Sequence, residues 1–513
     1  MFSRRKLLQT SLFYSLLPQN ILQAKVKEKF HNPFQVPPLA IAQRKGRDLY
    51  FNLRVQSGKS AILPNVLTPT LGINLPFLGE TIRANRGDRV HIKVKNSLNE
   101  ATTLHWHGMK LPAKMDGGPH QPIPPDTEWT SDFEIIQNAA TLWYHSHQMH
   151  QTGKQVYLGL AGMFILDDEK SRELNLPKQY GEDDFPVIIQ DRDFEQDGSF
   201  RYIRSMHDIM MGKTGDTILV NGVINPVLKT DKSLIRLRLL NGSNARIYQL
   251  TFDDQRAFEL IASDGGLLEK PIQTKSITLA PAERVEILVD VSDGKMPVLM
   301  HKSVQKSNSQ GGLMGMMMKM IGMNGDQHQH DDSDTEANHD DEHDSQNSFS
   351  IFQIDARSAS TKKVSIPDKL VDFEAPPQEI VRRRVMKLEM KMGPEMMMSG
   401  PEGNLTINGK TMEMSRIDET VQSGSSEIWV IENHSMYSHP FHIHNVQFKI
   451  IKREGGVSGH ETGYKDIVLV HPNEPVEVLM IFPEFRDPDI PYMYHCHILE
   501  HEDAGMMGQF VTV

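Results

Sequence analysis

The chain has 513 residues, of which 38% are hydrophobic and 24% charged, and this predicts a soluble globular protein of about two to four packed units. The formal net charge of −11 argues against a protein that neutralises nucleic-acid phosphates, and no apolar run approaches the roughly 20 residues needed to cross a bilayer. One cysteine excludes an intramolecular disulfide and a tetrathiolate zinc site, whereas 29 methionines and 23 histidines indicate soft-metal chemistry.

The first residues have the form of an export signal. Arg4 and Arg5 follow Ser3, and a short apolar stretch over 12–17 comes next. A basic stretch before a short apolar one is typical of signal peptides, and paired arginines after serine resemble a bacterial twin-arginine signal, which exports folded proteins. We therefore expect a twin-arginine-type signal peptide at 1–28, recognition by the twin-arginine export machinery and a periplasmic protein. An ordinary amphipathic N-terminus is the alternative.

Short strands dominate the rest of the chain. Polar and apolar residues alternate along these runs, and Asn-Gly turn signals separate them, which predicts antiparallel β-sandwiches. One plan, a polar turn followed by an alternating strand and then Asn, recurs at 87–96, 231–241 and 424–433. Because these repeats are spaced like sandwich domains with insertions, we expect three related sandwiches. Their predicted bounds are 29–175, 176–356 and 357–513.

Two segments differ from this pattern. Six methionines lie between Gly311 and Met323, and nine acidic residues and four histidines, without lysine or arginine, lie between Asp326 and Asp344. The acidic stretch has too few apolar residues to build a core, so we predict a solvated insertion at 308–348 within the second sandwich. A second cluster of six methionines lies at 386–398, in the third sandwich.

Four histidine motifs carry the chemistry. In an extended strand, residues two apart point the same way, so each His-x-His pair presents two imidazoles to one face. Cys496 lies between His495 and His497 and therefore faces the opposite side, so that one strand serves two metal centres. The motifs are His105-Trp106-His107-Gly108, His145-Ser146-His147, His439-Pro440-Phe441-His442-Ile443-His444 and His495-Cys496-His497-Ile498-Leu499-Glu500-His501.

The thiol indicates which metal binds. A site of one cysteine and two histidines with a long axial methionine is the signature of blue copper. Cys496, His501 and Met506 have the close spacing of a cupredoxin ligand loop, and an upstream histidine such as His439 would complete the site. The eight remaining histidines of the motifs form four pairs, a number that suits three further copper ions.

With these motifs in this order, the chain resembles the three-domain multicopper oxidases, and most closely the bacterial periplasmic copper oxidases of the CueO type. The resemblance extends over essentially the whole mature chain. It implies an all-β fold of three consecutive cupredoxin-like Greek-key β-sandwich domains, four copper ions and dioxygen as co-substrate. It also implies the ligands: His439, Cys496 and His501 with axial Met506 for type 1 copper, His105 and His442 for type 2 copper, and His107, His145 and His497 on one type 3 ion with His147, His444 and His495 on the other.

Reduction of dioxygen to water also requires protons, which carboxylates near the cluster can supply. The resemblance points to Asp116, in the turn after the first motif, and to Glu502, directly after His501. The alternatives are a turn aspartate that caps its own backbone and a glutamate on the surface.

In copper-oxidising relatives, methionines and acidic residues near the type 1 site bind cuprous ion, for which thioethers are suitable soft ligands. The corresponding candidates here are Met390, Met392, Glu395, Met396 and Met436. Just before His439, this chain has Ser435-Met436-Tyr437 where those relatives have an aspartate and a methionine. A core strand or helix is the alternative interpretation of the methionines at 390–398.

Three functions remain open on the sequence. The first is a periplasmic cuprous oxidase for copper tolerance, and the second is a laccase-like oxidase of phenols or Fe(II). The third is a copper-sequestering protein without enzymatic activity, although mere storage does not need a complete set of paired histidines. In each case we expect a monomer that binds no nucleic acid and does not insert stably into a membrane.

Overall fold

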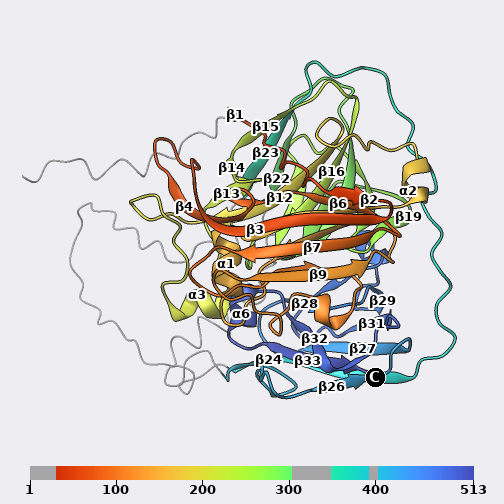
Figure 1. Cartoon of the computed structure of the whole chain (residues 1–513). Coiled ribbons are helices and arrows are strands. Elements are labelled where there is room, and N and C mark those ends of the chain that lie inside the picture. Colours follow the sequence, from red (N-terminus) through yellow and green to blue (C-terminus); the bar gives the residue numbers. More distant parts are fainter. Residues whose placement is uncertain (1–29, 303–347, 392–402) are drawn as a thin grey trace, which may run out of the picture.

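The computed structural model describes residues 30–302, 348–391 and 403–513, and these residues have the all-β fold that the strand pattern predicts. Six sheets pair into three sandwiches, each with its own hydrophobic core, and the sandwiches pack against one another (Figure 1). The predicted signal peptide at 1–28 and nearly all of the predicted insertion at 308–348 lie outside the described residues. The helices and 3-10 turns are short: η1 (Ala113–Met115), α1 (Thr152–Leu158), α2 (Glu169–Glu173), α3 (Met206–Met211), η2 (Gly459–Thr462) and α6 (Leu499–Asp503).

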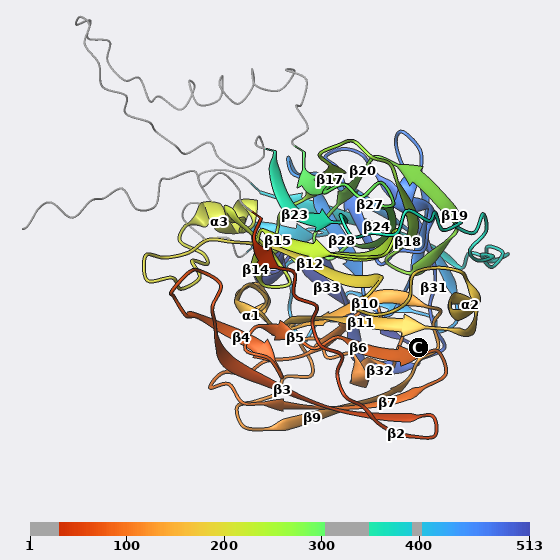
Figure 2. The ribbon, with the colours of Figure 1, turned by 90° about the horizontal axis from the view of Figure 1, so that it is seen from above.

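The first sandwich packs a sheet of order β5-β4-β3-β7-β9, with β2 beside β3, against a sheet of order β6-β11-β10-β8. The bounds are β2 (Gln43–Lys45), β3 (Asp48–Ser60), β4 (Thr68–Ile73), β5 (Leu78–Gly79), β6 (Ile82–Asn85), β7 (Arg89–Asn96), β8 (His105–His107), β9 (Glu128–Glu134), β10 (Ala140–His145) and β11 (Ala161–Asp167). Figure 2 shows β3, β7 and β9 at the outside of the molecule, whereas β10 and β11 lie toward the other sandwiches. Because β10 and β11 are covered on both faces, nearly all of their residues are buried.

The middle sandwich packs a sheet of order β14-β13-β12-β16-β21-β18-β19 against one of order β1-β15-β23-β22-β17-β20. The bounds are β1 (Asn32–Pro33), β12 (Asp184–Arg192), β13 (Thr217–Val220), β14 (Val223–Ile224), β15 (Pro226–Lys229), β16 (Leu234–Asn241), β17 (Tyr248–Phe252), β18 (Phe258–Ser263), β19 (Gly266–Thr274), β20 (Ser276–Leu279), β21 (Arg284–Asp290), β22 (Val298–His301) and β23 (Phe349–Asp355). β22 pairs with β23, so the strands on either side of the segment 303–347 both belong to this sandwich.

The last sandwich packs a sheet of order β25-β24-β27-β31-β29 against one of order β26-β33-β32-β28-β30. The bounds are β24 (Arg382–Met390), β25 (Leu405–Ile407), β26 (Glu419–Val421), β27 (Ser426–Asn433), β28 (His439–Ile443), β29 (Phe448–Lys452), β30 (Ile467–Val470), β31 (Val476–Ile481), β32 (Asp487–Cys496) and β33 (Met507–Thr512). Its core contains the motif cysteine, Cys496, and Met506 among buried aliphatic and aromatic side chains.

The three repeats predicted from the sequence are the strands β7, β16 and β27. Each pairs in parallel with an earlier strand of its sheet and antiparallel with a later one, so the sandwiches are not purely antiparallel as the alternation alone predicts. The asparagines at their ends, Asn96, Asn241 and Asn433, make the same bonds. In each, the side-chain oxygen accepts from the amide two residues on, and the side-chain nitrogen donates to two carbonyl groups. The repeat therefore extends to individual hydrogen bonds.

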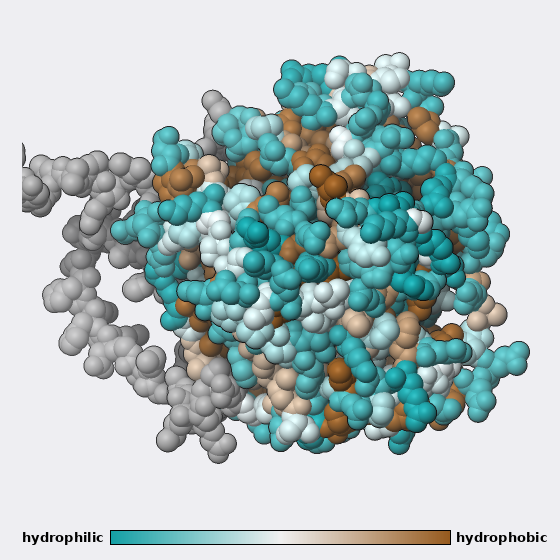
Figure 3. Space-filling model, in the orientation of Figure 1, coloured by the Kyte–Doolittle hydropathy of each residue, from teal (hydrophilic) through white to brown (hydrophobic). Residues whose placement is uncertain are grey.

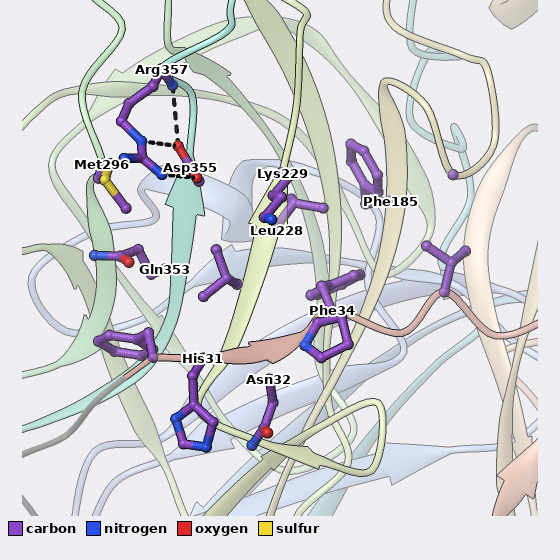
Figure 4. Close-up of a pocket in the computed structure, with 15 residues that line it drawn as sticks. His31, Asn32, Phe34, Phe185, Leu228, Lys229, Met296, Gln353, Asp355 and Arg357 are labelled. Atoms are coloured by element: carbon purple, nitrogen blue, oxygen red, sulfur yellow. Dashed lines mark hydrogen bonds and ion pairs between the residues drawn. The ribbon is translucent and has the colours of Figure 1, made fainter.

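The first strand, β1, does not stay with the sandwich that follows it in the chain. It lies in parallel beside β15 at the edge of the middle sandwich, where Phe34 packs edge-to-face on Phe185 with 6.2 Å between ring centroids. A cavity of about 460 Å³ lies at this seam. Among the residues that line it, Arg357 pairs with Asp355 (Figure 4). The residues that line it, all within the described part of the chain, include none of the four histidine motifs.

One face of the molecule carries a mixture of hydrophilic residues and small hydrophobic patches (Figure 3). Among the helices that the structure describes, none has the length and apolar character required to span a bilayer.

Strand β16 is buried on both faces although arginine alternates with leucine along it. Arg238 donates to Asp184 at 2.7 Å and to Glu286 at 2.8 Å, and Arg236 donates to Glu286 at 2.8 Å. Burial alone would raise the pKa of Glu286, but the two arginines outweigh this effect and lower it to about 2. The alternating pattern thus marks a buried row of ion pairs instead of a solvent-exposed face.

This network predicts an acid-sensitive middle sandwich. A carboxylate with a lowered pKa in the folded state stabilises the fold above its unfolded pKa, near 4.5, and this stabilisation is lost as the pH falls toward 2. The loss for Glu286 should be about 3 kcal/mol. Between pH 7 and about pH 3 roughly 2 kcal/mol of this loss should appear, because the folded carboxylate titrates fully only near pH 2 and below. Guanidinium unfolding at the two pH values measures the loss, and Glu286→Gln should lose less free energy of unfolding between them than the unmodified protein does. Equal losses in both proteins would contradict this assignment.

Candidate metal centres

The histidine motifs lie on two antiparallel strand pairs, one from the first sandwich and one from the last. In the first pair, β8 and β10 place His105 opposite His145. In the second pair, β28 and β32 place His442 opposite His495. The second histidine of each motif lies two positions on, within β8 for His107 and just past the ends of β10, β28 and β32 for His147, His444 and His497, so each pair presents a cluster of imidazoles.

The two clusters meet and form three buried groups of imidazoles. The ring nitrogens within each group lie within 4.8 Å of one another. The closest approaches include 3.4 Å between His107 Nδ1 and His145 Nε2, and 3.2 Å between the Nε2 atoms of His147 and His495. The groups are His105, His442 and His444; His107, His145 and His497; and His147, His444 and His495. The second and third are the two trios that the resemblance implies for type 3 copper, and the first joins the two implied for type 2 copper.

These imidazoles have the properties of metal ligands. Burial lowers the pKa of most of them well below the ordinary histidine value, so they are neutral and retain a lone pair for a metal. Within the described residues, Nε2 of His105, Nε2 of His442 and both ring nitrogens of His497 are buried without a hydrogen-bond partner. Buried polar atoms are otherwise nearly always paired, so this donor set fits copper ions with imidazole ligands.

Asp116 positions two of the imidazoles. Its Oδ2 lies 2.8 Å from Nδ1 of His444, and its backbone carbonyl accepts from Nδ1 of His105 at 2.9 Å. The next residue, Gly117, has φ +75°, and a Cβ there would lie 1.9 Å from the carbonyl oxygen of Leu104, so glycine lets this turn approach β8 closely. Asp116 is thus buried at the cluster and does not only cap its own turn.

Glu502 also lies next to two of the cluster's imidazoles, in this case with both oxygens of its carboxylate. Its two carboxylate oxygens each lie 3.2 Å from an Nδ1 atom, one of His147 and one of His495. It is buried, so the alternative of a surface glutamate is wrong. Helix α6 positions this carboxylate directly after His501.

A third carboxylate, Asp466, was not found by the sequence reasoning. Its Oδ1 accepts from Nε2 of His107 at 3.1 Å, and its backbone carbonyl accepts from Nδ1 of His442 at 2.7 Å. It directly precedes β30, which pairs with β28. That pairing brings it to His442 although no motif surrounds it in the sequence. Asp116 and Asp466 therefore each hydrogen-bond two imidazoles at the nitrogen that faces away from the proposed metal, and Glu502 lies within ion-pair distance of the same kind of nitrogen on two others.

The fourth group contains the thiol. The Nδ1 atoms of His439 and His501 lie 3.3 and 3.7 Å from Cys496 Sγ. His439, Cys496 and His501 are fully buried, and burial raises the pKa of the Cys496 thiol, so a bound metal is needed to keep it deprotonated. Met506 is also buried, and its carbonyl accepts from the Cys496 amide at 3.1 Å. These are the residue types of a blue copper site.

Helix α3 of the middle sandwich covers this fourth group, which the sequence reasoning also missed. A capping box of Ser205 and Asp208 begins the helix. The carbonyl of Met210 accepts from Nε2 of His501 at 3.0 Å and leaves Nδ1 to face the thiol. Met206 and Met211 on the same helix are each 37% exposed. The sequence feature that could have indicated this helix is a third, smaller group of methionines at 206–211, outside the two clusters of six methionines.

The predicted substrate residues fall into three cases. Met390 lies at the end of β24 and is buried in the core of the last sandwich, as the alternative interpretation predicts. Met436 is 61% exposed and lies three residues before His439, whose Nε2 contacts Ser435 Oγ at 2.8 Å. Met392, Glu395 and Met396 lie outside the described residues.

Comparisons with known proteins agree with this arrangement. Three family models, each described as multicopper oxidase, match residues 54–171, 197–334 and 382–513. The multicopper oxidase mco of Staphylococcus haemolyticus is 36% identical over 90% of this chain and 87% of its own length. The cell division protein FtsP of Escherichia coli is 33% identical over 94% of this chain and 92% of its own. The structure of the laccase-like multicopper oxidase CueO from Ochrobactrum, which is described as active on lignin model compounds, is similar with a TM-score of 0.79 and 32% identity, covering 94% of this chain and all of that one.

Proposed function

Because the chain belongs to the multicopper oxidase family, we propose that it couples one-electron oxidation of cuprous ion to the four-electron reduction of dioxygen to water. The observation that carries this proposal is the burial of ten motif histidines and the only cysteine in four groups. Export to the periplasm by the twin-arginine route, a monomeric state and a role in copper tolerance belong to the same proposal.

Copper ions bound by these groups would supply the redox chemistry, taking electrons singly from the reductant and giving four of them to dioxygen. The chain holds the thiol site and the histidine groups close together, since Cys496 is the direct covalent neighbour of His495 and His497. Asp116, Glu502 and Asp466 hold the imidazoles in one orientation and tautomer. The first two also offer buried carboxylates from which protons can pass to the reacting oxygen atoms.

The thioethers near the fourth group favour cuprous ion as the reductant. Met206 and Met211 lie on helix α3, in which the carbonyl of Met210 contacts His501, and Met436 directly follows Ser435, whose hydroxyl contacts His439. The segments that contact His501 and His439, helix α3 and the turn at Ser435, therefore each carry exposed methionines. Thioether sulfur is a soft ligand that prefers Cu(I) over harder cations.

Similar proteins support two alternative functions. The Ochrobactrum protein supports a laccase-like oxidase of phenols, for which the same four groups would serve. FtsP is described as a cell division protein, and the similarity to it supports a role in cell division; copper sequestration without enzymatic activity is the other non-oxidase alternative. The intact donor set in all four groups favours an oxidase over a protein that has no use for dioxygen.

Oxygen uptake with Cu(I), Fe(II) and a phenol, measured side by side on the copper-loaded protein, distinguishes these functions. We expect the highest rate with Cu(I). Met436→Leu, which removes one exposed thioether and keeps its size, should raise KM for Cu(I) about tenfold and leave phenol oxidation unchanged. Met296→Leu, at the cavity of Figure 4, is the matched control and should change neither. A higher rate with phenol or with Fe(II) would support the laccase-like function, and no uptake with any reductant would support the non-enzymatic one.

A further inference from the structure

The middle sandwich contributes none of the four histidine motifs, yet one of its side chains reaches the histidine cluster. Arg284, the first residue of β21, is fully buried. Its two terminal nitrogens donate to the two carboxylate oxygens of Asp466, at 2.7 and 2.6 Å. Asp466 belongs to the last sandwich, so a bidentate ion pair joins the two sandwiches next to the proposed metal site.

Arg284 is also bonded to the first sandwich. Its Nε donates to the carbonyl oxygen of Thr141 at 3.0 Å, and Thr141 lies on β10, the strand that ends in His145. The remaining two N–H groups donate to the carbonyl oxygens of Ala282 and Asp264, each at 3.1 Å. All five donors of the guanidinium are therefore used, and they fix its plane relative to all three sandwiches.

The ion pair determines which nitrogens the neighbouring imidazoles present. Asp466 accepts from Nε2 of His107 through its carboxylate and from Nδ1 of His442 through its carbonyl. The opposite nitrogens, Nδ1 of His107 and Nε2 of His442, are then the atoms left for a metal. His107 comes from the first sandwich and His442 from the last, so one residue orients a ligand from each side of the cluster.

The first histidine motif itself makes room for this pair. Gly108, directly after His107, has φ +84°. A Cβ at this position would lie 2.6 Å from Asp466 Oδ2 and 2.8 Å from Arg284 Nη2. Any other residue would be strained in this conformation and would push the carboxylate or the guanidinium away. The glycine of the motif is thus explained by the ion pair packed on it.

From these contacts we propose that Arg284 is a positioning residue for the proposed three-copper site. Through Asp466 it holds His107 and His442 in register, and the middle sandwich thereby aligns the two halves of a site to which it supplies no ligand. This inference rests on the proposed function, since it assumes that the histidine groups bind copper.

Copper retention in Arg284 variants tests the proposal. Removing a partner that orients a metal ligand commonly weakens metal binding about 10- to 100-fold. A competing chelator should therefore remove copper from the histidine groups of Arg284→Met at a concentration about tenfold lower than from the unmodified protein. The electron paramagnetic resonance signal of type 2 copper should also change in this variant. The blue colour should persist, because Arg284 contacts none of His439, Cys496 and His501. Arg284→Lys, which keeps the charge without the bidentate bonds, should show an intermediate change and serves if the methionine variant does not fold.

Arg238→Met is the matched control. Arg238 is also buried in the same sandwich and, like Arg284, is bonded to Thr141 of β10, whose hydroxyl lies 2.9 Å from its Nη1. Its carboxylate partners are Asp184 and Glu286, neither of which contacts a motif histidine, so it differs from Arg284 in lacking the bond to Asp466. Its variant should lower the thermal midpoint of the metal-free protein at least as much as the Arg284 variants do, with native copper retention and an unchanged signal. Equal copper loss in the control, or native retention and signal in Arg284→Lys and Arg284→Met, would overturn the proposal. Failure of the unmodified protein to bind four copper ions would instead overturn the proposed function.

Discussion

Replacing Cys496 by serine should abolish the blue colour and lower oxygen uptake with Cu(I) about a thousandfold. Sulfur is the only soft anionic donor in the group with His439 and His501, and a serine hydroxyl neither ionises readily nor suits copper as a ligand. The same strand, β32, carries the neighbours His495 and His497, so the substitution also removes the side chain at the shortest covalent connection between the two sites.

Visible absorption, copper content and oxygen uptake measure this effect together. Cys496→Ser should keep three copper ions and a type 2 resonance signal, which shows that the histidine groups remain formed. Met506→Leu is the matched control, because it removes only the proposed weak axial ligand and should keep the blue colour. Full oxygen uptake in Cys496→Ser would contradict the proposed path of electrons.

Replacing Asp116 by asparagine should give the second large effect, a fall in oxygen uptake of about 100-fold or more with the blue colour unchanged. Asparagine preserves the shape of the side chain and can still contact Nδ1 of His444, but it cannot exchange a proton. Asp116 Oδ1 is buried and has no hydrogen-bond partner among the described residues, so one oxygen remains free for this exchange.

Anaerobic reduction separates the two halves of the reaction in this variant. Cu(I) should bleach the blue colour of Asp116→Asn as fast as that of the unmodified protein, whereas reoxidation by dioxygen should be slow. Asp126→Asn, at an exposed turn of the same sandwich, should change neither rate. Slow bleaching with normal reoxidation would show that Asp116 acts at the reductant site instead.

Local patterns predicted the strands and the four histidine motifs, because both depend on residues close together in the chain, whereas the assignment of the motifs to separate metal sites was implied by the family resemblance. The two-residue spacing of His495 and His497 around Cys496 was enough to place imidazoles and thiol on opposite sides of one strand. The asparagine at the end of each repeat likewise forms bonds to residues a few positions away, so its role recurs wherever the local sequence does.

The residues that the sequence did not reveal act over long separations. Arg284 and Asp466 are 182 positions apart, and Met210 and His501 are 291 positions apart. Neither Asp466 nor Arg284 lies in a motif, and a buried arginine on an alternating strand has the pattern of a solvent-exposed one. Such contacts depend on how complete sandwiches dock, which the periodicity of a single strand does not specify.

The division of the histidine cluster between two sandwiches has a consequence for biosynthesis. His147 and His495 touch although 348 residues separate them, and domains generally fold in order as they leave the ribosome. The first sandwich must therefore expose four imidazoles on an uncovered face while the rest of the chain is still being translated. A stray metal ion captured by that half-site would obstruct docking of the last sandwich, so we expect correct maturation to depend on metal availability in the compartment of synthesis.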